Sequence, residues 1–175
     1  RMNMALAREL GHIEKKHQWL CLMLVDIDQF KRCNDRHGRA AGDCALKQVA
    51  ACLQQQLQKE AIGSEATLAR FGGEEFVLVL PDTDPAQAWD IGNRLRQGVV
   101  ECSSARTGNT ASPVTITVGF ACTCDRLNSK ADQLFEQADQ ALYAGKNKGR
   151  NCVIDYDHLL RQGGILSATP ADARC

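Results

Sequence analysis

The fold is decided by the stretch Arg70-Phe71-Gly72-Gly73-Glu74-Glu75-Phe76, which leads directly into an apolar run at residues 77–80. The paired glycines predict a tight turn between strands at 67–71 and 75–80, because glycine reaches backbone conformations that other residues avoid. Two carboxylates, Glu74 and Glu75, then follow at the start of the second strand. They suit a hard divalent cation held against a phosphate, but an ordinary hairpin with solvated acids at its tip would look the same.

A second acidic cluster lies upstream, at the end of a nearly continuous apolar run. Residues 19–25 predict a strand that is buried on both faces. Asp26 follows this strand, and a buried carboxylate is costly unless something pairs with it. Asp28 would share its face on a continuing strand, but it also reads as the N-cap of a helix that begins near residue 29. Because Mg²⁺ prefers one or two protein carboxylates, with phosphate and water as further ligands, Asp26 and a hairpin glutamate could hold it.

The other segments have simple helix and strand patterns. Asp43 reads as an N-cap and Pro85 as the first residue of a helix. The expected elements are helices at 2–17, 29–36, 43–58, 85–100 and 132–146, strands at 114–122 and 152–154, and a loop at 103–112. This order predicts an α/β (α+β) sandwich with a central, mostly antiparallel sheet flanked by helices.

Length and composition limit the possible functions. A chain of 175 residues is expected to form one domain over 1–158, with an entry helix at 1–17 and a tail or linker at 159–175. Its 21 acidic and 21 basic residues argue against a nucleic-acid polymer as partner. No apolar run is long enough to cross a membrane, so we expect no membrane contact by this chain.

The nine cysteines do not have the spacing of a zinc site. Cys122 and Cys124 are the only close pair, and no histidine lies near them. Cys21, Cys44 and Cys52 fall in apolar periodic stretches, where a reduced cysteine acts as a small core residue. An odd number of cysteines therefore indicates a reducing compartment, and a cytoplasmic location is expected.

Four blocks of the sequence together resemble the GGDEF domain, the diguanylate cyclase family that condenses two GTP into cyclic di-GMP (c-di-GMP). The resemblance runs from about residue 19 to residue 154, and Glu74 makes the signature a GGEEF variant. It implies a palm-like fold, as in class III nucleotidyl cyclases, with the first strand beside the hairpin, which would bring Asp26 to Glu74. The four blocks are Asp26-Ile27-Asp28-Gln29-Phe30-Lys31 with Asn34-Asp35, Gly42-Asp43, the signature at 70–76, and Ala138-Asp139-Gln140-Ala141-Leu142-Tyr143 with Lys146 and Gly149-Arg150-Asn151.

The resemblance also implies a role for individual residues. Catalysis would rest on Glu74, Glu75 and Asp26, and Mg²⁺ or Mn²⁺ would be held by Asp26, the carbonyl of Ile27 and Glu74. Guanine would be read by Asn34 and Asp43, and the phosphates would lie against Phe30, Lys31, Lys146 and Arg150. From their positions alone, Lys146 and Arg150 could equally be cations that complement the C-terminus of a helix.

Three positions depart from the family pattern. Arg39 stands where the family usually has histidine, beside the expected guanine loop. Gly145 replaces a usual alanine, which would weaken the helix end by up to about 1 kcal/mol. The Arg-x-x-Asp motif of the inhibitory site is missing, because Gly63 and Ala66 occupy its two positions. We therefore expect no inhibitory site.

The sequence leaves two hypotheses about function. The first is a working diguanylate cyclase that uses GTP as substrate and releases c-di-GMP from a transient homodimer of GGDEF domains. The second is a catalytically inert GGDEF domain that binds GTP or c-di-GMP and signals without synthesis. Retention of the signature acids and of Asp26 favours the first. In either case we expect the chain to be part of a longer protein with an upstream sensory or dimerising domain.

Overall fold

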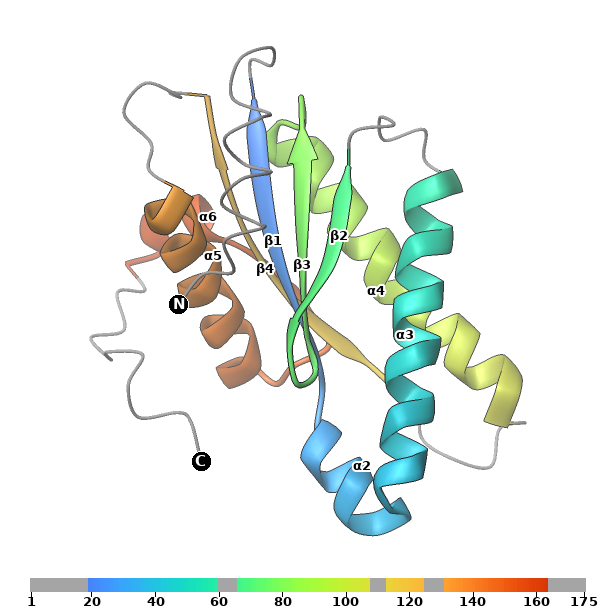
Figure 1. The fold of residues 1–175 in the computed structure, drawn as a ribbon. Coiled ribbons are helices and arrows are strands. Elements are labelled where there is room, and N and C mark those ends of the chain that lie inside the picture. Colours follow the sequence, from blue (N-terminus) through green and yellow to red (C-terminus); the bar gives the residue numbers. More distant parts are fainter. Residues whose placement is uncertain (1–18, 60–65, 108–112, 125–130, 164–175) are drawn as a thin grey trace.

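A computed structural model describes residues 19–59, 66–107, 113–124 and 131–163, and shows a central sheet with helices on both faces (Figure 1). The strands are β1 (Leu20–Ile27), β2 (Thr67–Gly72), β3 (Glu75–Pro81), β4 (Ile116–Thr123) and β5 (Val153–Asp155). The helices are α2 (Phe30–His37), α3 (Arg39–Lys59), α4 (Pro85–Thr107), α5 (Ala131–Asn147) and α6 (Tyr156–Arg161). None of the described helices is both long and apolar enough to cross a membrane.

The five-stranded sheet has the order β2-β3-β1-β4-β5. Every neighbouring pair is antiparallel except β4 and β5, which are parallel. The predicted sandwich with a mostly antiparallel sheet is therefore confirmed. The central strand β1 lies beside the hairpin as expected, with Asp26 opposite Glu75 on β3 and opposite Thr117 on β4.

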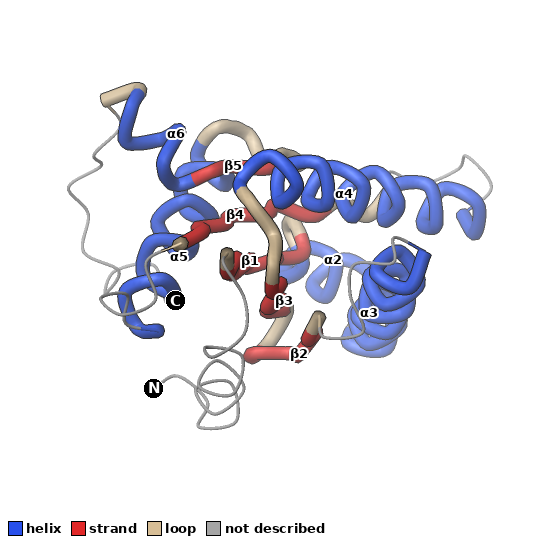
Figure 2. Tube along the Cα trace, turned by 90° about the horizontal axis from the view of Figure 1, so that it is seen from above, coloured by secondary structure: helices blue, strands red, loops and turns tan. Residues whose placement is uncertain are grey.

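The alternation of side chains along β1 supplies two separate cores. Cys21, Met23, Val25 and Ile27 face one core, into which α3 and α4 pack. Leu20, Leu22 and Leu24 face the other core, which α5 covers. Viewed along the sheet, α3 and α4 lie on one side of the strands, and α5 and α6 lie on the other (Figure 2). A buried strand with both faces covered explains the continuous apolar run in the sequence.

Helix α5 approaches the sheet closely at one position of β4. A Cβ atom added to Gly119 would overlap the backbone of α5 at Ala138 and Leu142. A helix can come this near to a strand only where the strand has no side chain between them. The missing side chain at Gly119 therefore sets the distance between α5 and the sheet.

Two predicted helix boundaries are wrong. Helix α3 begins at Arg39, so Asp43 lies inside its second turn and is not its N-cap. The carbonyl of Gly38 accepts from the N–H of Ala41 at 3.1 Å and from the N–H of Gly42 at 3.4 Å, and the good helix formers at 39–41 complete this first turn before Asp43 is reached. Helix α4 continues to Thr107 and includes part of the predicted loop. There the hydroxyls of Ser103 and Ser104 donate back to the carbonyl of Val100, at 2.9 and 2.8 Å.

The predicted start of α4 is confirmed, whereas the sequence analysis missed a short helix near residue 158. Pro85 is the first residue of α4, and Asp84 and Gln87 form reciprocal capping bonds of 2.9 and 3.0 Å around it. Helix α6 was not predicted; it is capped by the Asp155 carboxylate, which accepts from the N–H of Asp157 at 3.1 Å. This helix crosses the predicted boundary between domain and tail, and that boundary remains a prediction. The predicted entry helix at 2–17 lies outside the described residues.

Candidate active site

The candidate site lies at one end of the sheet, where β1 ends, the β2–β3 turn reverses the chain and α5 finishes (Figure 1). The turn is held by Arg70, whose Nε and Nη2 both donate to the carbonyl of Gly73, at 3.0 and 2.6 Å. The carbonyl of the next residue, Glu74, accepts from the N–H of Ile27 at 3.3 Å. These bonds fix the position of the signature glutamates relative to the end of β1.

Asp26 is a buried carboxylate in this site, with only 6% of its surface exposed. Its Oδ2 pairs with the Nζ of Lys146 on α5 at 2.8 Å. Burial raises the pKa of Asp26 to about 6; Lys146 opposes this rise, while the charges of Glu74 and Glu75 add to it. The charges of three carboxylates therefore act on one another at this position, and the partly buried ion pair with Lys146 offsets some of this negative charge.

This donor set fits a divalent cation that is completed by substrate. Among the described residues, no group of three or more His, Cys, Asp or Glu side chains forms a ready-made metal cluster. The charge of Glu74 lies near enough to raise the pKa of Asp26. The two carboxylates can therefore supply two hard anionic ligands. Two carboxylates are the usual protein share of a Mg²⁺ site that also binds phosphate. The excess of negative charge around Asp26 favours a cation there.

We expect Asp26→Asn to stabilise the metal-free protein at pH 8. The folded-state pKa of about 6 lies above the ordinary 3.8, so the folded protein holds this proton more tightly than the unfolded chain does. Ionisation of Asp26 therefore lowers the free energy of unfolding. The loss grows between pH 4 and 6 and reaches about 2–3 kcal/mol above pH 6. Urea unfolding in EDTA at pH 8 and pH 4 measures the difference, which should be largest at pH 8 and close to zero at pH 4.

The control for this prediction is Asp90→Asn, which changes an exposed carboxylate on α4. It should leave the free energy of unfolding unchanged at both pH values. An Asp26→Asn variant that is less stable than the wild type at pH 8 would contradict the argument. It would mean that the pair with Lys146 outweighs the desolvation of the carboxylate.

Asp28 does not cap α2, so that prediction is wrong. The N-cap is Gln29, which has a left-handed backbone with φ of 54° and makes no capping bond with its side chain. The Asp28 carboxylate instead accepts from the hydroxyls of Thr115 and Thr117, each at 2.6 Å, and from the N–H of Asn151 at 2.9 Å. These contacts turn Asp28 toward β4 and toward the loop that follows α5.

The predicted guanine readers are brought to the junction between α2 and α3. The amide of Asn34 lies against Gly42, where an added Cβ would overlap it. Asp43 is the residue after Gly42 on α3, so the two predicted readers lie on two helices that are in contact at this point. Phe30 and Lys31 are the first two residues of α2, and the backbone N–H groups of a first helical turn have no acceptor within their own helix.

The last turn of α5 and the loop after it carry the two predicted phosphate-binding cations. Lys146 reaches Asp26, so its side chain serves the site and not only the helix terminus. Arg150 follows the helix in a left-handed conformation with φ of 68°, and its N–H donates to the carbonyl of Gly145 at 3.1 Å. Gly145 is buried against Thr117, whose methyl carbon would lie 2.6 Å from an added Cβ. Packing, rather than helix propensity, explains glycine at this position.

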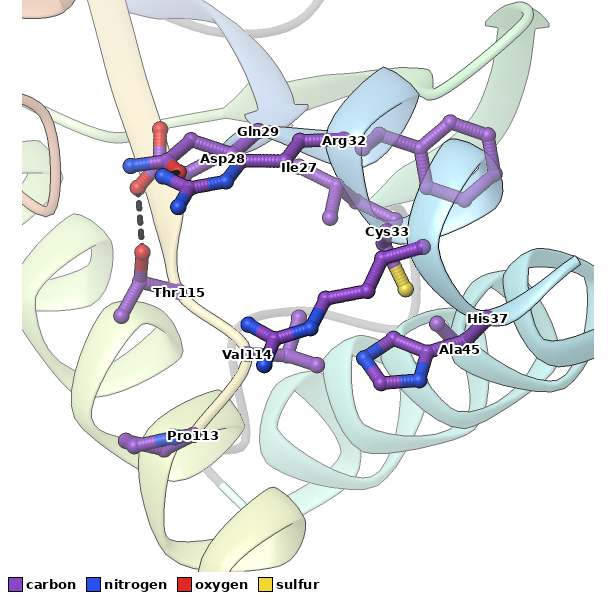
Figure 3. A pocket seen from close by; sticks show the side chains of 12 residues that line it. Ile27, Asp28, Gln29, Arg32, Cys33, His37, Ala45, Pro113, Val114 and Thr115 are labelled. Atoms are coloured by element: carbon purple, nitrogen blue, oxygen red, sulfur yellow. Dashed lines mark hydrogen bonds between the residues drawn. The ribbon is translucent and has the colours of Figure 1, made fainter. Parts of the chain in front are cut away.

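A pocket of about 390 Å³ lies on the α3 side of the end of β1 (Figure 3). Ile27 and Asp28 contribute to its wall, together with the basic side chains Arg32, Arg36 and His37 of α2. Neither the signature glutamates nor the predicted guanine readers line it. The sequence analysis did not predict this pocket, because its wall combines residues from two distant parts of the chain, 27–45 and 113–115.

The sequence reasoning also missed the partners of Asp28. Thr115 and Thr117 lie in a β-branched stretch that is typical of any strand, and nothing in the pattern marks their hydroxyls as functional. The cysteine prediction is confirmed for Cys21 and Cys52, which are buried in the core and form no disulfide, but it is wrong for Cys44. Cys44 is exposed, and its sulfur accepts from the side-chain amide of Gln48 at 3.2 Å.

Comparison with known proteins agrees with this fold. Residues 1–152 match the family described as diguanylate cyclase, GGDEF domain. Diguanylate cyclase A of Treponema denticola is 38% identical over 139 residues, which cover 79% of this chain and 36% of that protein. Diguanylate cyclase DgcP of Pseudomonas aeruginosa is 39% identical over 146 residues, covering 83% of this chain and 21% of that protein. The chain therefore spans about a third of the first relative and a fifth of the second.

Among solved structures, the GGDEF domain of DgcB from Caulobacter crescentus, in complex with c-di-GMP, superimposes with a TM-score of 0.75. Its sequence is 28% identical, and the match covers 88% of this chain and 87% of that one. The chain belongs to the GGDEF diguanylate cyclase family. Its five-stranded sheet with flanking helices is the palm-like cyclase fold of that family.

Proposed function

We propose that this domain is a working diguanylate cyclase, which condenses two GTP molecules into c-di-GMP and releases two pyrophosphates. The observation that carries the proposal is the buried carboxylate of Asp26, which faces the signature glutamates and is paired with Lys146. A carboxylate is costly to bury in this way, and a purely structural position would not need it. Perturbed carboxylates with a specific charge partner are typical of functional sites.

The proposed reaction joins the 3′-oxygen of one GTP to the α-phosphorus of another, and the bond from that phosphorus to the pyrophosphate oxygen breaks. Asp26, the carbonyl of Ile27 and Glu74 would hold Mg²⁺ or Mn²⁺, which would neutralise phosphate charge and lower the pKa of the attacking hydroxyl. Glu74 accepts the hydroxyl proton, with Glu75 beside it. Lys146 and Arg150 supply positive charge to the departing pyrophosphate.

Guanine recognition is assigned to the junction of α2 and α3. The Asp43 carboxylate can accept from both N1–H and the 2-amino group of guanine, a donor pair that adenine lacks. Asn34 adds an amide that can donate and accept at the same base. The first-turn N–H groups at Phe30 and Lys31, with the Lys31 ammonium, favour the negative charge of the triphosphate. This arrangement selects GTP over ATP.

Each domain of this kind holds one GTP, whereas the product contains two equivalent 3′–5′ bonds. Two domains must therefore face each other about a two-fold axis, so that each hydroxyl reaches the α-phosphate that is bound by its partner. The dimer is transient, and in the full protein an upstream dimerising domain would raise its population. The proposal of a further dimerising domain is supported by a solved structure of DgcB that contains a coiled coil as well as a GGDEF domain.

The alternative function is an inert domain that binds GTP or c-di-GMP, and one experiment separates the two. The domain is incubated with GTP and Mg²⁺, pyrophosphate release is followed continuously, and the nucleotide products are resolved by chromatography. Release of one pyrophosphate per GTP, with c-di-GMP as product, supports the cyclase. Nucleotide binding without pyrophosphate release would support the binding module.

We further expect product inhibition to be weak and competitive with GTP. Gly63 and Ala66 provide neither the arginine nor the aspartate of the family's inhibitory site. The product would then bind only at the guanine site proposed at Asn34 and Asp43, where the substrate also binds. Initial rates at several GTP and c-di-GMP concentrations measure the inhibition pattern. Tight, noncompetitive inhibition that survives Asn34→Ala and Asp43→Ala would contradict this expectation.

A further inference from the structure

Asp28 joins three segments that are far apart in the sequence, and the proposed reaction gives it no role. Its Oδ1 accepts from the Thr117 hydroxyl, while its Oδ2 accepts from the Thr115 hydroxyl and from the N–H of Asn151. The bond to Thr115 is visible beside the pocket (Figure 3). The carboxylate thus links the end of β1 to the start of β4 and to the loop after α5. With both oxygens engaged in this way, Asp28 is a poor candidate for a metal ligand.

The loop that Asp28 holds has an unusual backbone. Gly149, Arg150 and Asn151 all have positive φ values, of 115°, 68° and 46°. Residues with a side chain avoid this region, and they remain in it only where the surrounding structure holds them. Arg150 lies in the middle of this run, directly before the residue that Asp28 binds.

Asn151 is held from two directions. Its backbone N–H donates to Asp28, while its side-chain Oδ1 accepts from Nη1 of Arg96 on α4 at 3.0 Å. On the other side of Arg150, the chain is tied to α5 through the bond from the Arg150 N–H to the Gly145 carbonyl. The backbone of Arg150 is therefore fixed at both ends, and Asp28 provides the anchor that comes from the catalytic strand β1.

The anchor is itself held by packing against α5. Thr117 is fully buried, and its methyl group packs against Gly145 in the last turn of that helix. This contact directs the Thr117 hydroxyl toward Asp28. Asp28 is thus connected to the helix end that carries Lys146 as well as to the loop that carries Arg150.

We propose that Asp28 is a positioning residue, which holds Arg150 in its left-handed conformation and so presents this cation to the triphosphate of the substrate. The inference rests on the proposed function, since it assigns Arg150 to the phosphates. It assigns to Asp28 no contact with metal or nucleotide. Loss of Asp28 should release the loop, weaken binding of a guanosine triphosphate and leave the sheet intact.

The first test needs no nucleotide. Amide hydrogen exchange at Asn151 is measured by NMR in the wild type and in the variants Asp28→Ala, Thr117→Val and Thr117→Ser. We expect exchange at Asn151 to be at least about tenfold faster in Asp28→Ala. Thr117→Val removes the hydroxyl and should give a smaller increase, whereas Thr117→Ser keeps it and should restore protection. Unchanged exchange at Asn151 in Asp28→Ala would overturn the proposal.

The second test is a double-mutant cycle between Asp28 and Arg150. The probe is the α,β-methylene analogue of GTP with Mg²⁺, which cannot release pyrophosphate, and its Kd is measured by calorimetry. Introduced into the wild-type sequence, Asp28→Ala should raise Kd about tenfold. Introduced into the Arg150→Ala variant, it should raise Kd less than twofold, because Asp28 affects binding only by positioning Arg150. Asp90→Ala, a change at an exposed carboxylate of α4, is the matched control and should not alter Kd.

The outcomes separate this inference from the proposed function. Equal losses in both backgrounds would overturn the positioning role while leaving a GTP-binding site in place. A wild-type domain that does not bind the analogue would overturn the proposed function, and the assignment of Arg150 to phosphates would fail with it. The exchange experiment would still decide whether Asp28 holds the loop.

Discussion

Glu74→Gln is expected to abolish c-di-GMP synthesis while the domain remains folded. The change keeps the size and shape of the side chain but removes the negative charge that would hold the cation and accept the proton. Phosphoryl transfer depends mainly on such placed charges, so the rate should fall by about 10²-fold or more. Asp26→Asn should lose as much activity, although it is expected to stabilise the metal-free fold. Pyrophosphate release at saturating GTP and Mg²⁺ measures both effects.

The matched control is Glu101→Gln, which makes the same chemical change at an exposed position on α4. It should retain the wild-type rate, and circular dichroism should be the same for all variants. If Glu74→Gln kept most of the wild-type turnover, the assignment of this residue to metal and proton would be wrong. A loss that was accompanied by unfolding would point to a structural role for the turn.

Specific activity is expected to rise with protein concentration, and fusion to a dimeric coiled coil should raise it by about 10²-fold in dilute solution. In the proposed facing-dimer mechanism, two domains must meet before either bond can form, so the rate per domain falls as the protein is diluted. A parallel coiled coil at the N-terminus holds two domains together, so that each experiences its partner at an effective concentration on the order of millimolar instead of the micromolar concentration in solution. Initial rates between roughly 0.1 and 10 μM protein, with sedimentation analysis of the same samples, measure the dependence.

Two control fusions make this prediction specific. A coiled-coil sequence with disrupted heptads adds the same length without dimerisation and should give no gain. The intact coiled coil fused to the Glu74→Gln variant should remain inactive. Constant specific activity across a hundredfold dilution, in samples shown to be monomeric, would refute the facing-dimer mechanism.

The elements that the sequence predicted correctly are those with strong local patterns. The apolar run before Asp26 predicted β1 and the paired glycines before Glu74 predicted the hairpin, while the place of β1 beside the hairpin followed from the resemblance to the GGDEF family. Side-chain period and turn chemistry are local properties, and antiparallel neighbours joined by a tight turn leave few alternatives. The helix boundaries were less certain, because Asp43 and Asp28 both look like caps from their neighbours alone. In the folded chain, one lies inside a helix and the other binds β4.

The interactions that the sequence could not predict depend on tertiary packing. The bond between Asp28 and Asn151 joins residues 123 positions apart, and no local pattern connects them. The same is true of the pair formed by Lys146 and Asp26, for which the sequence suggested only a phosphate contact or a helix-terminus charge. Gly145 looked like a weak helix former, but its lack of a side chain makes room for Thr117. Burial decided each of these cases.

The close approach of α5 to β4 at Gly119 makes the active site sensitive to a position outside it. Lys146 can reach Asp26 only because its helix lies directly on the sheet, and a single methyl group at residue 119 would lift that helix. Small substitutions there would change the reach of Lys146 toward Asp26 without altering either residue. If the proposed function holds, the rate of synthesis would be adjustable in graded steps from the interior of the protein, with the signature sequence unchanged.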